Sequence, residues 1–522
     1  MLEPPCDNRN SKLIGVALAE ELVRDVVILG GGTAGWMTAA ALSRALNRRV
    51  NLTVVESDEI GTVGVGEATI PPLTQFNHML GIDEDEFIRE TQGTFKLGIE
   101  FSDWARNGDR YMHGFGRPRK DIQLASFEQA WEKAARAGLA ADLPAYSITK
   151  TAAYAGKFTR PRMDAQDSPL FDIAYAFHFD AGLYAKYLRR YSEQLGVKRI
   201  EGKVVDVSRN ATTGHIVSLN LSSGLEIAGQ FFVDCSGFRG RLIEEVFETG
   251  YEDWTHWLPC DRAIAVPCAS VKPLLPYTRA TARDAGWQWR IPLQHRIGNG
   301  YVFSSNFISE DEAAATLLKN LDGQALAQPR TLKFVTGRRR KAWRENCVAI
   351  GLSSGFLEPL ESTSIHLIQT AVARLLQFFP SSTPSQPDID EYNRLTQREF
   401  EHVRDFIILH YHATKRDDTA LWNYCRTMSI PDTLRRKLQL FQAHGRLIFE
   451  PDALFIESGW TQVLHGQGLR AKEYQRILDV IKTKDIVTYL DGWRRAIKAC
   501  VDAMPTHERF IEAHCRSPAS PA

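Results

Sequence analysis

The amino-acid sequence predicts an α/β fold with a parallel core sheet, an inserted second sheet and a helical C-terminal part. Asp25–Leu29 is a short apolar strand, which is followed by a glycine turn, a helical pattern over 36–46 and a second strand over 51–56. A helix that joins two parallel strands forms a β-α-β unit. Long stretches between 199 and 310 alternate as strands do, whereas the pattern from about 364 onward is helical.

Length and composition exclude several classes of protein. The 522 residues are enough for two or three structural units. The 63 basic and 63 acidic residues give zero formal net charge, which argues against a nucleic-acid binder. No apolar run reaches the roughly 20 residues of a membrane helix, and the start shows no secretory pattern. The eight cysteines are scattered without a CxxC pair, so we expect no metal site and a cytoplasmic location.

A glycine turn lies directly between the first strand and the first helix. Gly30, Gly32 and Gly35 fit the pattern G-x-G-x-x-G at this place. The first glycine permits a tight turn, the second lets a pyrophosphate approach the backbone, and the third allows close helix packing. The helix N-terminus faces the phosphate charge. A purely structural turn is the alternative, but strand, turn and helix in register favour a dinucleotide.

An acidic residue ends the second strand. Glu56 follows the turn by about 20 residues, where a carboxylate accepts hydrogen bonds from a ribose. A carboxylate there does not suit a 2′-phosphate, so FAD or NAD is favoured over NADP. The sequence holds one such fingerprint, whereas separate FAD and NAD(P)H domains would normally show two. We therefore predict FAD, with reducing equivalents that come from elsewhere.

These observations predict a single-component FAD-binding fold of the glutathione-reductase-like kind. Residues 1–24 are expected to be an N-terminal extension, 25–370 the FAD-binding domain with interleaved substrate-side segments, and 371–522 a mainly helical region that completes the substrate site. Within them we expect short buried strands at 231–234 and 347–350, other strands across 199–233 and 262–310, and helices across 76–110 and 180–197.

Two early segments have both a functional and a structural interpretation. The stretch 61–71 contains three glycines and Glu67 directly after the second strand, which suits either a backbone beside a cofactor or a surface loop. Lys96 lies between apolar neighbours in a segment with a helical pattern. A buried lysine needs a partner or a task, but an exposed lysine on a solvated face is the ordinary interpretation.

Two tryptophans stand out later in the chain. Trp287 and Trp289 are two residues apart in a predicted strand, so their indoles lie on one face. Two large rigid rings side by side can close off a cavity or a passage. An ordinary aromatic core pair is the alternative.

An acid and three hydroxyl residues follow the strand at 347–350. Ser362, Thr363 and Ser364 precede an apolar helical run and are of the types that cap helices. Free backbone N–H groups at such a helix start attract an anion. Glu361 is close enough in sequence to act there as an acid or a base. Simple helix capping is the alternative.

Taken together, these segments resemble the flavin-dependent tryptophan halogenases. The resemblance covers about 30 to 422, roughly three-quarters of the chain, and the combination of WxWxIP with GxGxxG is highly specific. It rests on the following motifs: GGGTAGW (30–36), GVGEATIP (64–71), FK (95–96), HFDA (178–181), DCSGFRG (234–240), WQWRIP (287–292), GYVFSS (300–305), FLEPLEST (356–363) and RDDTALW (416–422).

The resemblance implies a two-component reaction. A separate flavin reductase supplies reduced FAD by diffusion, and reduced FAD, O2 and halide yield hypohalous acid. This oxidant travels through a tunnel to a lysine and a glutamate, which Lys96 and Glu361 match. Lys96 would hold or carry the electrophilic halogen, and Glu361 would help polarise it or remove the proton from the ring. Trp287 and Trp289 would keep the organic substrate off the flavin.

The resemblance also implies the other site residues. Halide would lie near Thr363 and Ser364, and a small aromatic substrate would stack on His113 and Phe115. The substrate and its tunnel would further involve Trp287, Trp289, Pro71 and Phe356. FAD would contact Gly30, Gly32, Thr33, Ala34, Gly35, Glu56, Gly66, Glu67, Ala68, Val205, Leu352 and Ile365. The enzyme would be a monomer or a homodimer.

Two departures from the family pattern bear on the substrate. The family's tryptophan enzymes usually read ESTGIY, whereas this chain reads Glu361-Ser-Thr-Ser-Ile-His366. Their late lid, rich in tyrosine and glutamate, holds the amino-acid end of tryptophan and has no clear counterpart in 449–468. The sequence resembles the branch with STSIH that acts on other indoles, so we expect an indole-type substrate and a preference for bromide.

Two other functions compete with this one. A flavin monooxygenase that hydroxylates an aromatic is the main alternative among enzymes, and the WQWRIP motif and Lys96 argue against it. A degenerate flavin-binding protein that serves as a partner or scaffold is the non-enzyme alternative. The presence of both Lys96 and Glu361 argues against that interpretation.

Overall fold

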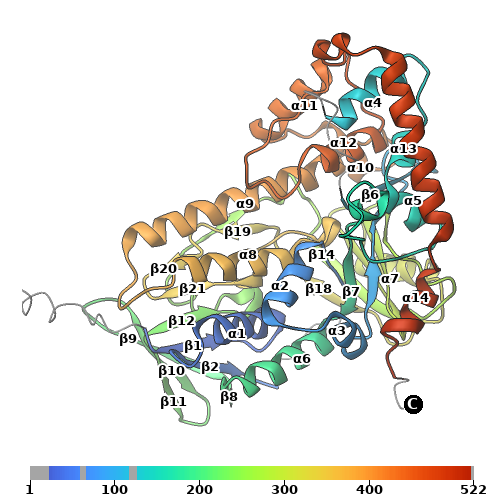
Figure 1. The fold of residues 1–522 in the computed structure, drawn as a ribbon. Helices are drawn as coiled ribbons and strands as arrows, with labels where there is room; N and C mark the ends of the chain where they lie inside the picture. The colour runs from blue at the N-terminus through green and yellow to red at the C-terminus, as the bar shows by residue number, and fades with distance from the viewer. Residues whose placement is uncertain (1–22, 59–65, 117–125, 519–522) are drawn as a thin grey trace, which may run out of the picture.

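A six-stranded, mostly parallel sheet forms one half of the molecule. The computed structural model describes residues 23–58, 66–116 and 126–518. The strand order is β20-β21-β12-β1-β2-β8. β1 (Asp25–Leu29) pairs in parallel with β2 (Asn51–Glu56) and with β12 (Phe231–Asp234), and β12 pairs in parallel with β21 (Cys347–Ala349). The crossover helix α1 (Thr33–Leu46) lies against this sheet, so the predicted β-α-β unit and buried strands are confirmed (Figure 1).

Further strands and one helix belong to the half of the molecule that contains the six-stranded sheet. Helix α6 confirms most of the helix predicted over 180–197, and the strands from β8 to β12 confirm those predicted over 199–233. The elements are α6 (Ala181–Gln194), β8 (Lys198–Glu201), β9 (Val204–Arg209), β10 (Ile216–Leu221), β11 (Glu226–Ala228), β13 (Tyr251–Asp253), β19 (Gly337–Arg339), β20 (Trp343–Arg344) and β22 (Gly355–Phe356).

The inserted sheet has seven strands in the order β18-β14-β17-β16-β15-β5-β6. Its strands confirm the prediction over 262–310, where helix α7 begins only at Glu310. The strands are β5 (Gly98–Ser102), β6 (Arg110–Gly114), β14 (Arg262–Ala269), β15 (Thr278–Arg283), β16 (Gly286–Pro292), β17 (Arg296–Phe303) and β18 (Arg330–Lys333), with α7 spanning Glu310–Lys319.

The helix predicted across 76–110 is wrong for most of its length. Helices α2 (Pro72–Leu80) and α3 (Glu84–Glu90) are followed by β4 (Thr94–Lys96), and then by β5 and β6. β4 forms a small sheet with β3 (Gly66–Ala68) and β7 (Ala176–Asp180). The apolar residues of this segment are buried on both faces, and a buried strand and a buried helix have similar sequence patterns.

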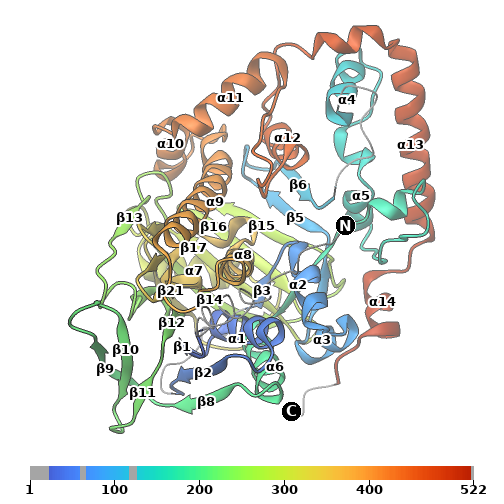
Figure 2. The ribbon, with the colours of Figure 1, turned by 60° about the vertical axis from the view of Figure 1, so that its left-hand side comes forward.

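The helical part is built from two separate stretches of chain. Helices α4 (Phe127–Arg136) and α5 (Ile148–Tyr154), which the sequence pattern did not indicate, pack against α13 near the opposite end of the sequence (Figure 2). The later helices are α8 (Ser364–Gln377), α9 (Gln386–His412), α10 (Ala420–Thr427), α11 (Asp432–His444), α12 (Glu457–Gly466), α13 (Thr483–Ala503) and α14 (His507–His514).

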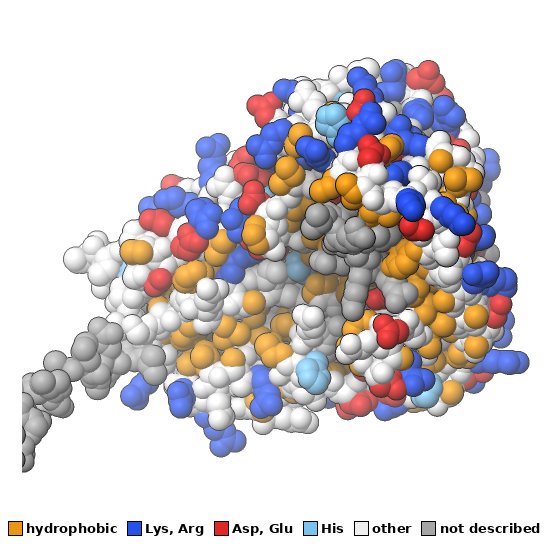
Figure 3. Space-filling model, turned by 45° about the horizontal axis from the view of Figure 1, so that its top comes forward, with side chains coloured by type: hydrophobic (Ala, Val, Ile, Leu, Met, Phe, Trp, Pro, Cys, Tyr) orange, Lys and Arg blue, Asp and Glu red, His pale blue; other side chains and the backbone are white. Residues whose placement is uncertain are grey.

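The surface agrees with the balanced composition. On the face shown in Figure 3, acidic and basic side chains lie interspersed. Among the described residues, no helix is long and apolar enough to cross a membrane. The seven cysteines in that part of the chain are all free thiols. Residues 1–22 of the predicted extension, and Gly61 and Gly64, lie outside the described residues.

Candidate active site

A cavity of about 770 Å³ lies at the carboxyl ends of β1 and β2. This volume is typical of a site for a cofactor-sized molecule. Most of the predicted cofactor residues line it, namely Gly30, Gly32, Thr33, Ala34, Glu56, Gly66, Glu67, Ala68, Leu352 and Ile365. Val205 does not, since its side chain is 53% exposed and its neighbour Val204 faces the cavity instead. Gly35 lies beneath the turn rather than in the lining.

The glycine turn has the geometry that a dinucleotide needs. Gly30 has φ of +115°, which favours glycine. A Cβ at Gly35 would lie 1.8 Å from the Gly30 oxygen, so the third glycine permits helix and turn to touch. A Cβ at Gly32 would meet no protein atom within 4 Å, so this backbone is open to the cavity at the start of α1. The turn therefore fits FAD phosphates at its second glycine.

Two carboxylates flank the turn. Glu56 accepts a hydrogen bond from Trp36 Nε1 at 3.4 Å and is ion-paired with Arg199. A Cβ at Gly31 would lie 1.3 Å from Glu56 Oε2, so this carboxylate packs directly on the turn. Burial raises the pKa of Glu67 to about 7. The cavity wall thus offers one acid that is paired with an arginine and one acid that titrates near neutrality.

The two tryptophans border the far side of this cavity. Trp287 and Trp289 lie on β16 with their rings 6.1 Å apart, and both line the cavity together with Phe356. We call Trp287 and Trp289 the tryptophan wall. Trp287 Nε1 donates to Glu358 Oε2 at 2.7 Å, and Tyr411 OH donates to the same oxygen at 2.7 Å. Burial raises the pKa of Glu358 to about 7, so the wall is held by an acid that is protonated below neutrality.

Lys96 lies outside the cavity lining and is fully buried. It ends β4, with 0% of its surface exposed, which rules out the interpretation as a solvated surface lysine. Its Nζ donates to Ser362 Oγ at 2.7 Å and to the Thr69 carbonyl at 2.9 Å, and lies 5.2 Å from the centre of the Phe115 ring. Burial lowers the pKa of Lys96 to about 7, against the opposing charge of Glu361.

Glu361 is buried between two histidines. Its Oε2 is 2.8 Å from His113 Nδ1, and its Oε1 is 2.6 Å from His410 Nε2. Burial by itself would raise the pKa of Glu361, but the interactions with His113 and His410 outweigh it and hold the pKa below its usual range. Glu361 ends a short 3₁₀ helix, and Ser362 next to it has φ of +59°. This turn presents Ser362 to Lys96.

The start of α8 has the features of an anion site. Thr363 is the residue before the helix, its side chain caps no backbone N–H, and its Oγ1 is buried without a partner among the described residues. Ser364 lines the cavity. His366 of the unusual STSIH sequence does not point here, because its Nε2 lies 3.3 Å from Glu399 on α9. The difference from the ESTGIY pattern at His366 therefore affects the packing of α8 on α9.

Aromatic and apolar side chains lie around His113 and Phe115, and we call this region the aromatic space. The Phe455 ring stacks on Phe406 at 4.1 Å and lies 6.0 Å from the His113 ring. Leu454 packs against the apolar cluster that contains Phe115. Gly459 on α12 touches His113, since a Cβ there would lie 2.9 Å from His113 Nε2. The segment 449–468 thus does reach this space, and it contributes apolar side chains. Pro71 is the residue before α2 and does not line the nucleotide cavity.

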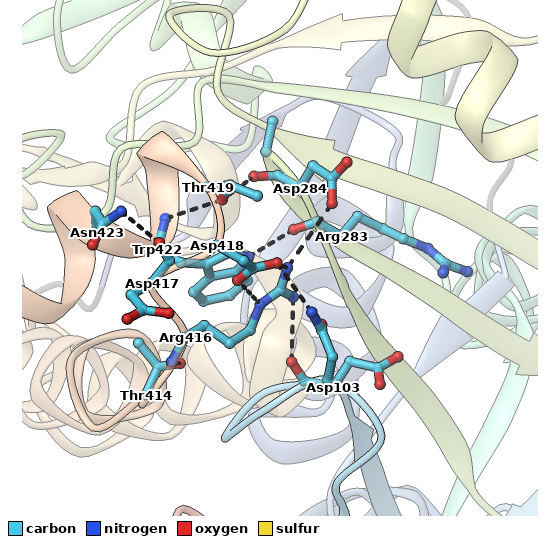
Figure 4. Close-up of polar contacts among 12 residues, drawn as sticks. Asp103, Arg283, Asp284, Thr414, Arg416, Asp417, Asp418, Thr419, Trp422 and Asn423 are labelled. Atoms are coloured by element: carbon cyan, nitrogen blue, oxygen red, sulfur yellow. Dashed lines mark hydrogen bonds and ion pairs between the residues drawn. The ribbon is translucent and has the colours of Figure 1, made fainter.

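The RDDTALW segment fastens the wall hairpin to the helices. Figure 4 shows Arg416 paired with Asp418 and lying against Trp422. Its Nη2 and Nε donate to the two Asp418 oxygens at 2.8 and 2.9 Å. Trp422 Nε1 donates to the Arg283 carbonyl at 2.8 Å, and Thr419 Oγ1 donates to the Asp284 carbonyl at 2.8 Å. Arg283 ends β15, and Asp284 follows it in the turn that leads into β16, which carries the tryptophan wall.

The fold and the site define a flavin-dependent halogenase. The model of the tryptophan halogenase family matches residues 25–483, and the chain belongs to this family. It is 36% identical over 441 residues to a tryptophan 6-halogenase from Streptomyces toxytricini, covering 79% of this chain and 83% of that one.

Solved structures of the same class are similar over nearly the whole chain. A flavin-dependent halogenase from Xanthomonas campestris has a TM-score of 0.93 and 48% identity, covering 96% of this chain and 100% of that one. One from Brevundimonas sp. BAL3 has a TM-score of 0.91 and 45% identity, covering 95% of this chain and 99% of that one. The predictions of the family, the fold and an enzyme of this class are confirmed.

Several residues of the site carried no signal in the sequence. Ser362 was noted only as a cap, whereas it binds Lys96. Glu358 lies within the FLEPLEST motif, but nothing marked it as the partner of the wall. His410 sits in an apolar helical run, where a histidine is ordinarily a core residue. A search for isolated polar residues in apolar runs would have identified both His410 and Lys96 as candidate site residues.

Proposed function

We propose that this chain is a reduced-FAD-dependent halogenase of an electron-rich, indole-type aromatic, with bromide preferred over chloride. The observation that carries the proposal is the arrangement of Lys96 and Glu361. Both are fully buried, and both lie outside the lining of a cavity that ends at the tryptophan wall. Because Lys96 and Glu361 do not face the cofactor cavity, they suit a reaction with the aromatic substrate rather than with the cofactor. A hydroxylase that works directly from its flavin needs no such separation.

FAD would bind through the cavity residues named above. The N-terminus of α1 and the open backbone at Gly32 would hold its phosphates, and Glu56 its ribose. Reduced FAD, with O2 and halide, supplies hypohalous acid. Thr363 and Ser364 would hold the halide, because the buried Thr363 hydroxyl and the free N–H groups at the start of α8 are donors that suit an anion.

Lys96 would hold the oxidant at one position next to the substrate. With a pKa of about 7, a large fraction of its amine is neutral at neutral pH. A neutral amine takes the halogen from hypohalous acid as an N–halogen bond and releases water, while the ammonium form holds hypohalous acid by a hydrogen bond. Either form keeps an indiscriminate oxidant at one atom, beside Phe115.

Glu361 would accept the proton that leaves the ring. When the halogen bonds to a ring carbon, the carbon must release its hydrogen as a proton to restore aromaticity. An ionised carboxylate near the halogen donor is suited to receive it. The low pKa of Glu361 keeps it ionised for this step, and its negative charge also favours a positive charge on the ring.

The aromatic space supports a neutral substrate. Leu454, Phe455 and Phe406 present apolar surfaces beside His113 and Phe115. A bound ammonium or carboxylate would need matching charged partners, and these residues provide none. Without a clamp for an amino acid, intrinsic reactivity should direct attack to C3 of indole. Bromide is easier to oxidise than chloride, which favours bromination.

The chain's organisation follows from these roles. Residues 25–370 would bind FAD and supply Lys96 and Glu361, and 371–522 would complete the substrate site through α9 and 449–468. A separate flavin reductase would deliver reduced FAD. The free thiols suit a cytoplasmic location, where thiols stay reduced, and the working form would be a monomer or a homodimer.

A competition experiment tests the substrate and halide. Indole and tryptophan are offered together, with equal bromide and chloride, O2 and a generic flavin reductase, and the products are resolved by position. We expect 3-bromoindole as the main product. Efficient chlorination of tryptophan on its benzo ring would contradict the proposed substrate and halide, and hydroxylated product without any organohalide would contradict the proposed reaction.

A further inference from the structure

A chain of polar contacts runs from the end of α12 to Glu361, with hydrogen bonds as far as His410 and a close His410–Glu361 contact at its end. Gln467 Nε2 donates to Tyr111 OH at 3.2 Å and to the His410 carbonyl at 2.9 Å. Tyr111 OH is 3.1 Å from His410 Nδ1, and His410 Nε2 is 2.6 Å from Glu361 Oε1. All four side chains are buried. Each link joins a different element, so the chain exists only in the folded protein.

The direction of each hydrogen bond can be assigned. The His410 carbonyl can only accept, so the amide nitrogen of Gln467 must face it, and the same nitrogen then donates to the Tyr111 oxygen. The hydroxyl hydrogen of Tyr111 is left for His410 Nδ1, which must accept it. His410 Nε2 therefore carries the hydrogen, and this N–H lies against the Glu361 carboxylate at 2.6 Å as a close polar contact.

The surroundings hold this histidine as a neutral ring. Phe101 stacks on both Tyr111, at 5.0 Å, and His410, at 4.5 Å, and it excludes water from the chain. Burial lowers the pKa of His410, with Glu361 opposing and His113 adding to the lowering. The opposite tautomer would turn a lone pair of Nε2 toward the carboxylate and repel it.

We propose that Tyr111 and Gln467, acting through His410, are positioning residues that fix Glu361 in its ionised, productively oriented form. This rests on the proposed function, in which Glu361 receives the proton of the ring. The oxygen Oε1 is held by His410, while Oε2 is held by His113, which faces the aromatic space. The chain also links Glu361 to the segment 449–468, which borders the substrate.

The test uses Tyr111→Phe, which keeps the stacked ring and removes one hydroxyl. Three quantities are measured with a generic reductase, bromide and indole: FAD affinity, hypohalous acid captured by a diffusible β-diketone without indole, and brominated indole per halide oxidised. We expect the first two to stay unchanged. The third should fall about tenfold, because His410, which contacts the general base, loses its hydrogen bond to Tyr111, with KM for indole unchanged.

A double-mutant cycle separates positioning from general packing. In His410→Gln, the side-chain amide supplies an N–H to Glu361 and has no tautomers, so activity should exceed that of His410→Ala. Adding Tyr111→Phe to His410→Gln should then cost less than twofold. Tyr184→Phe is the matched control, because it removes another buried hydroxyl, bonded to Asn77 at 2.9 Å, and should change none of the three quantities.

The outcomes distinguish this proposal from the function on which it rests. Unchanged bromination per oxidised halide in Tyr111→Phe, or the same loss in the His410→Gln background, would overturn the positioning role. Wild-type protein that yields neither captured hypohalous acid nor organohalide would overturn the proposed function instead. Should Tyr111→Phe not fold, Gln467→Met serves in its place, with a smaller loss expected in the same ratio.

Discussion

The nucleotide cavity and the Lys96–Glu361 region are built on opposite principles. The cavity is open, about 770 Å³ in volume, and it is shaped by backbone and by glycines that leave space. The region around Lys96 is closed, and buried ionisable side chains fill it and contact one another. The tryptophan wall borders the cavity, and neither Lys96 nor Glu361 lines it.

The difference shows how one chain can separate two reactions. A cavity of free backbone N–H groups can bind and release a charged cofactor with little rearrangement. Buried ionisable groups, in contrast, must neutralise one another, because each alone would pay a large desolvation cost. Pairing fixes their positions, which a reactive halogen requires. Each change below should affect one region and spare the other.

The largest effect is expected from Lys96→Met. Loss of the amine should lower organohalide formation by about 10³-fold or more, within the range of a missing catalytic group, while FAD affinity stays unchanged. The measurement is product per enzyme together with an FAD titration. Lys133→Met is the control, because this buried lysine binds the Leu478 and Ile481 carbonyls and should affect stability only. Full activity of Lys96→Met would contradict the role of the lysine.

Gly32→Val should produce the converse result. A Cβ at this position meets no protein atom within 4 Å, so the protein should fold, but the branched group of valine would occupy the space of the FAD phosphates. We expect FAD affinity to fall at least about 100-fold, measured by fluorescence titration. Gly492→Val in α13, also open within 4 Å, is the matched control. Unchanged FAD affinity in Gly32→Val would mean that the turn is structural only.

Arg416→Met should weaken the connection between the two regions. The substitution removes the pair with Asp418 and the contact with Trp422, which fasten the turn before the wall. Since Asp418 remains partly exposed, we expect a loss of about 1–3 kcal/mol in the free energy of unfolding, measured by denaturant titration. More hydroxylated or uncoupled turnover is also expected. A free energy of unfolding equal to that of the wild type would show that the contacts of Arg416 with Asp418 and Trp422 do not stabilise the protein.

Glu358→Gln should have the smallest effect, and one that depends on pH. Burial raises the pKa of Glu358 from 4.5 to about 7, so the folded state binds more protons than the unfolded state between these values. Its contribution to stability is therefore present at low pH and is lost as the pH rises toward 7. Glutamine keeps an acceptor for Trp287 and Tyr411 and does not titrate. The Tm of both proteins is measured from pH 5 to pH 8. The Tm of the variant should rise relative to that of the wild type as the pH increases. A constant difference between the two Tm values would contradict the raised pKa of Glu358.

Local patterns were enough to predict much of the cofactor half. The strand, glycine turn, helix and acid from Asp25 to Glu56 form a contiguous unit, and each residue type has one main structural reason there. The pairing of Trp287 and Trp289 on one face follows from the strand period alone. The resemblance to a family extended these local predictions to Lys96 and Glu361.

Only the tertiary structure decided how those side chains are used. The segment around Lys96 has the apolar pattern of a buried element of either kind, and its strand form depends on pairing with β7, about 80 residues away. Burial lowers the pKa of Lys96, and Thr69 and Ser362 accept its hydrogen bonds. The pKa of Glu361 is held low by His113 and His410, which come from other elements of the fold.

The sequence by itself therefore determined the class of fold, the glycine turn and the family. The tertiary structure decided which polar groups meet inside the core and which of them share protons. The physical reason is range: strand and helix periods, turns and caps are set by residues within a few positions of one another, whereas desolvation and charge pairing depend on distance in space. Lys96 and Ser362 are 266 positions apart in the chain and 2.7 Å apart in the fold.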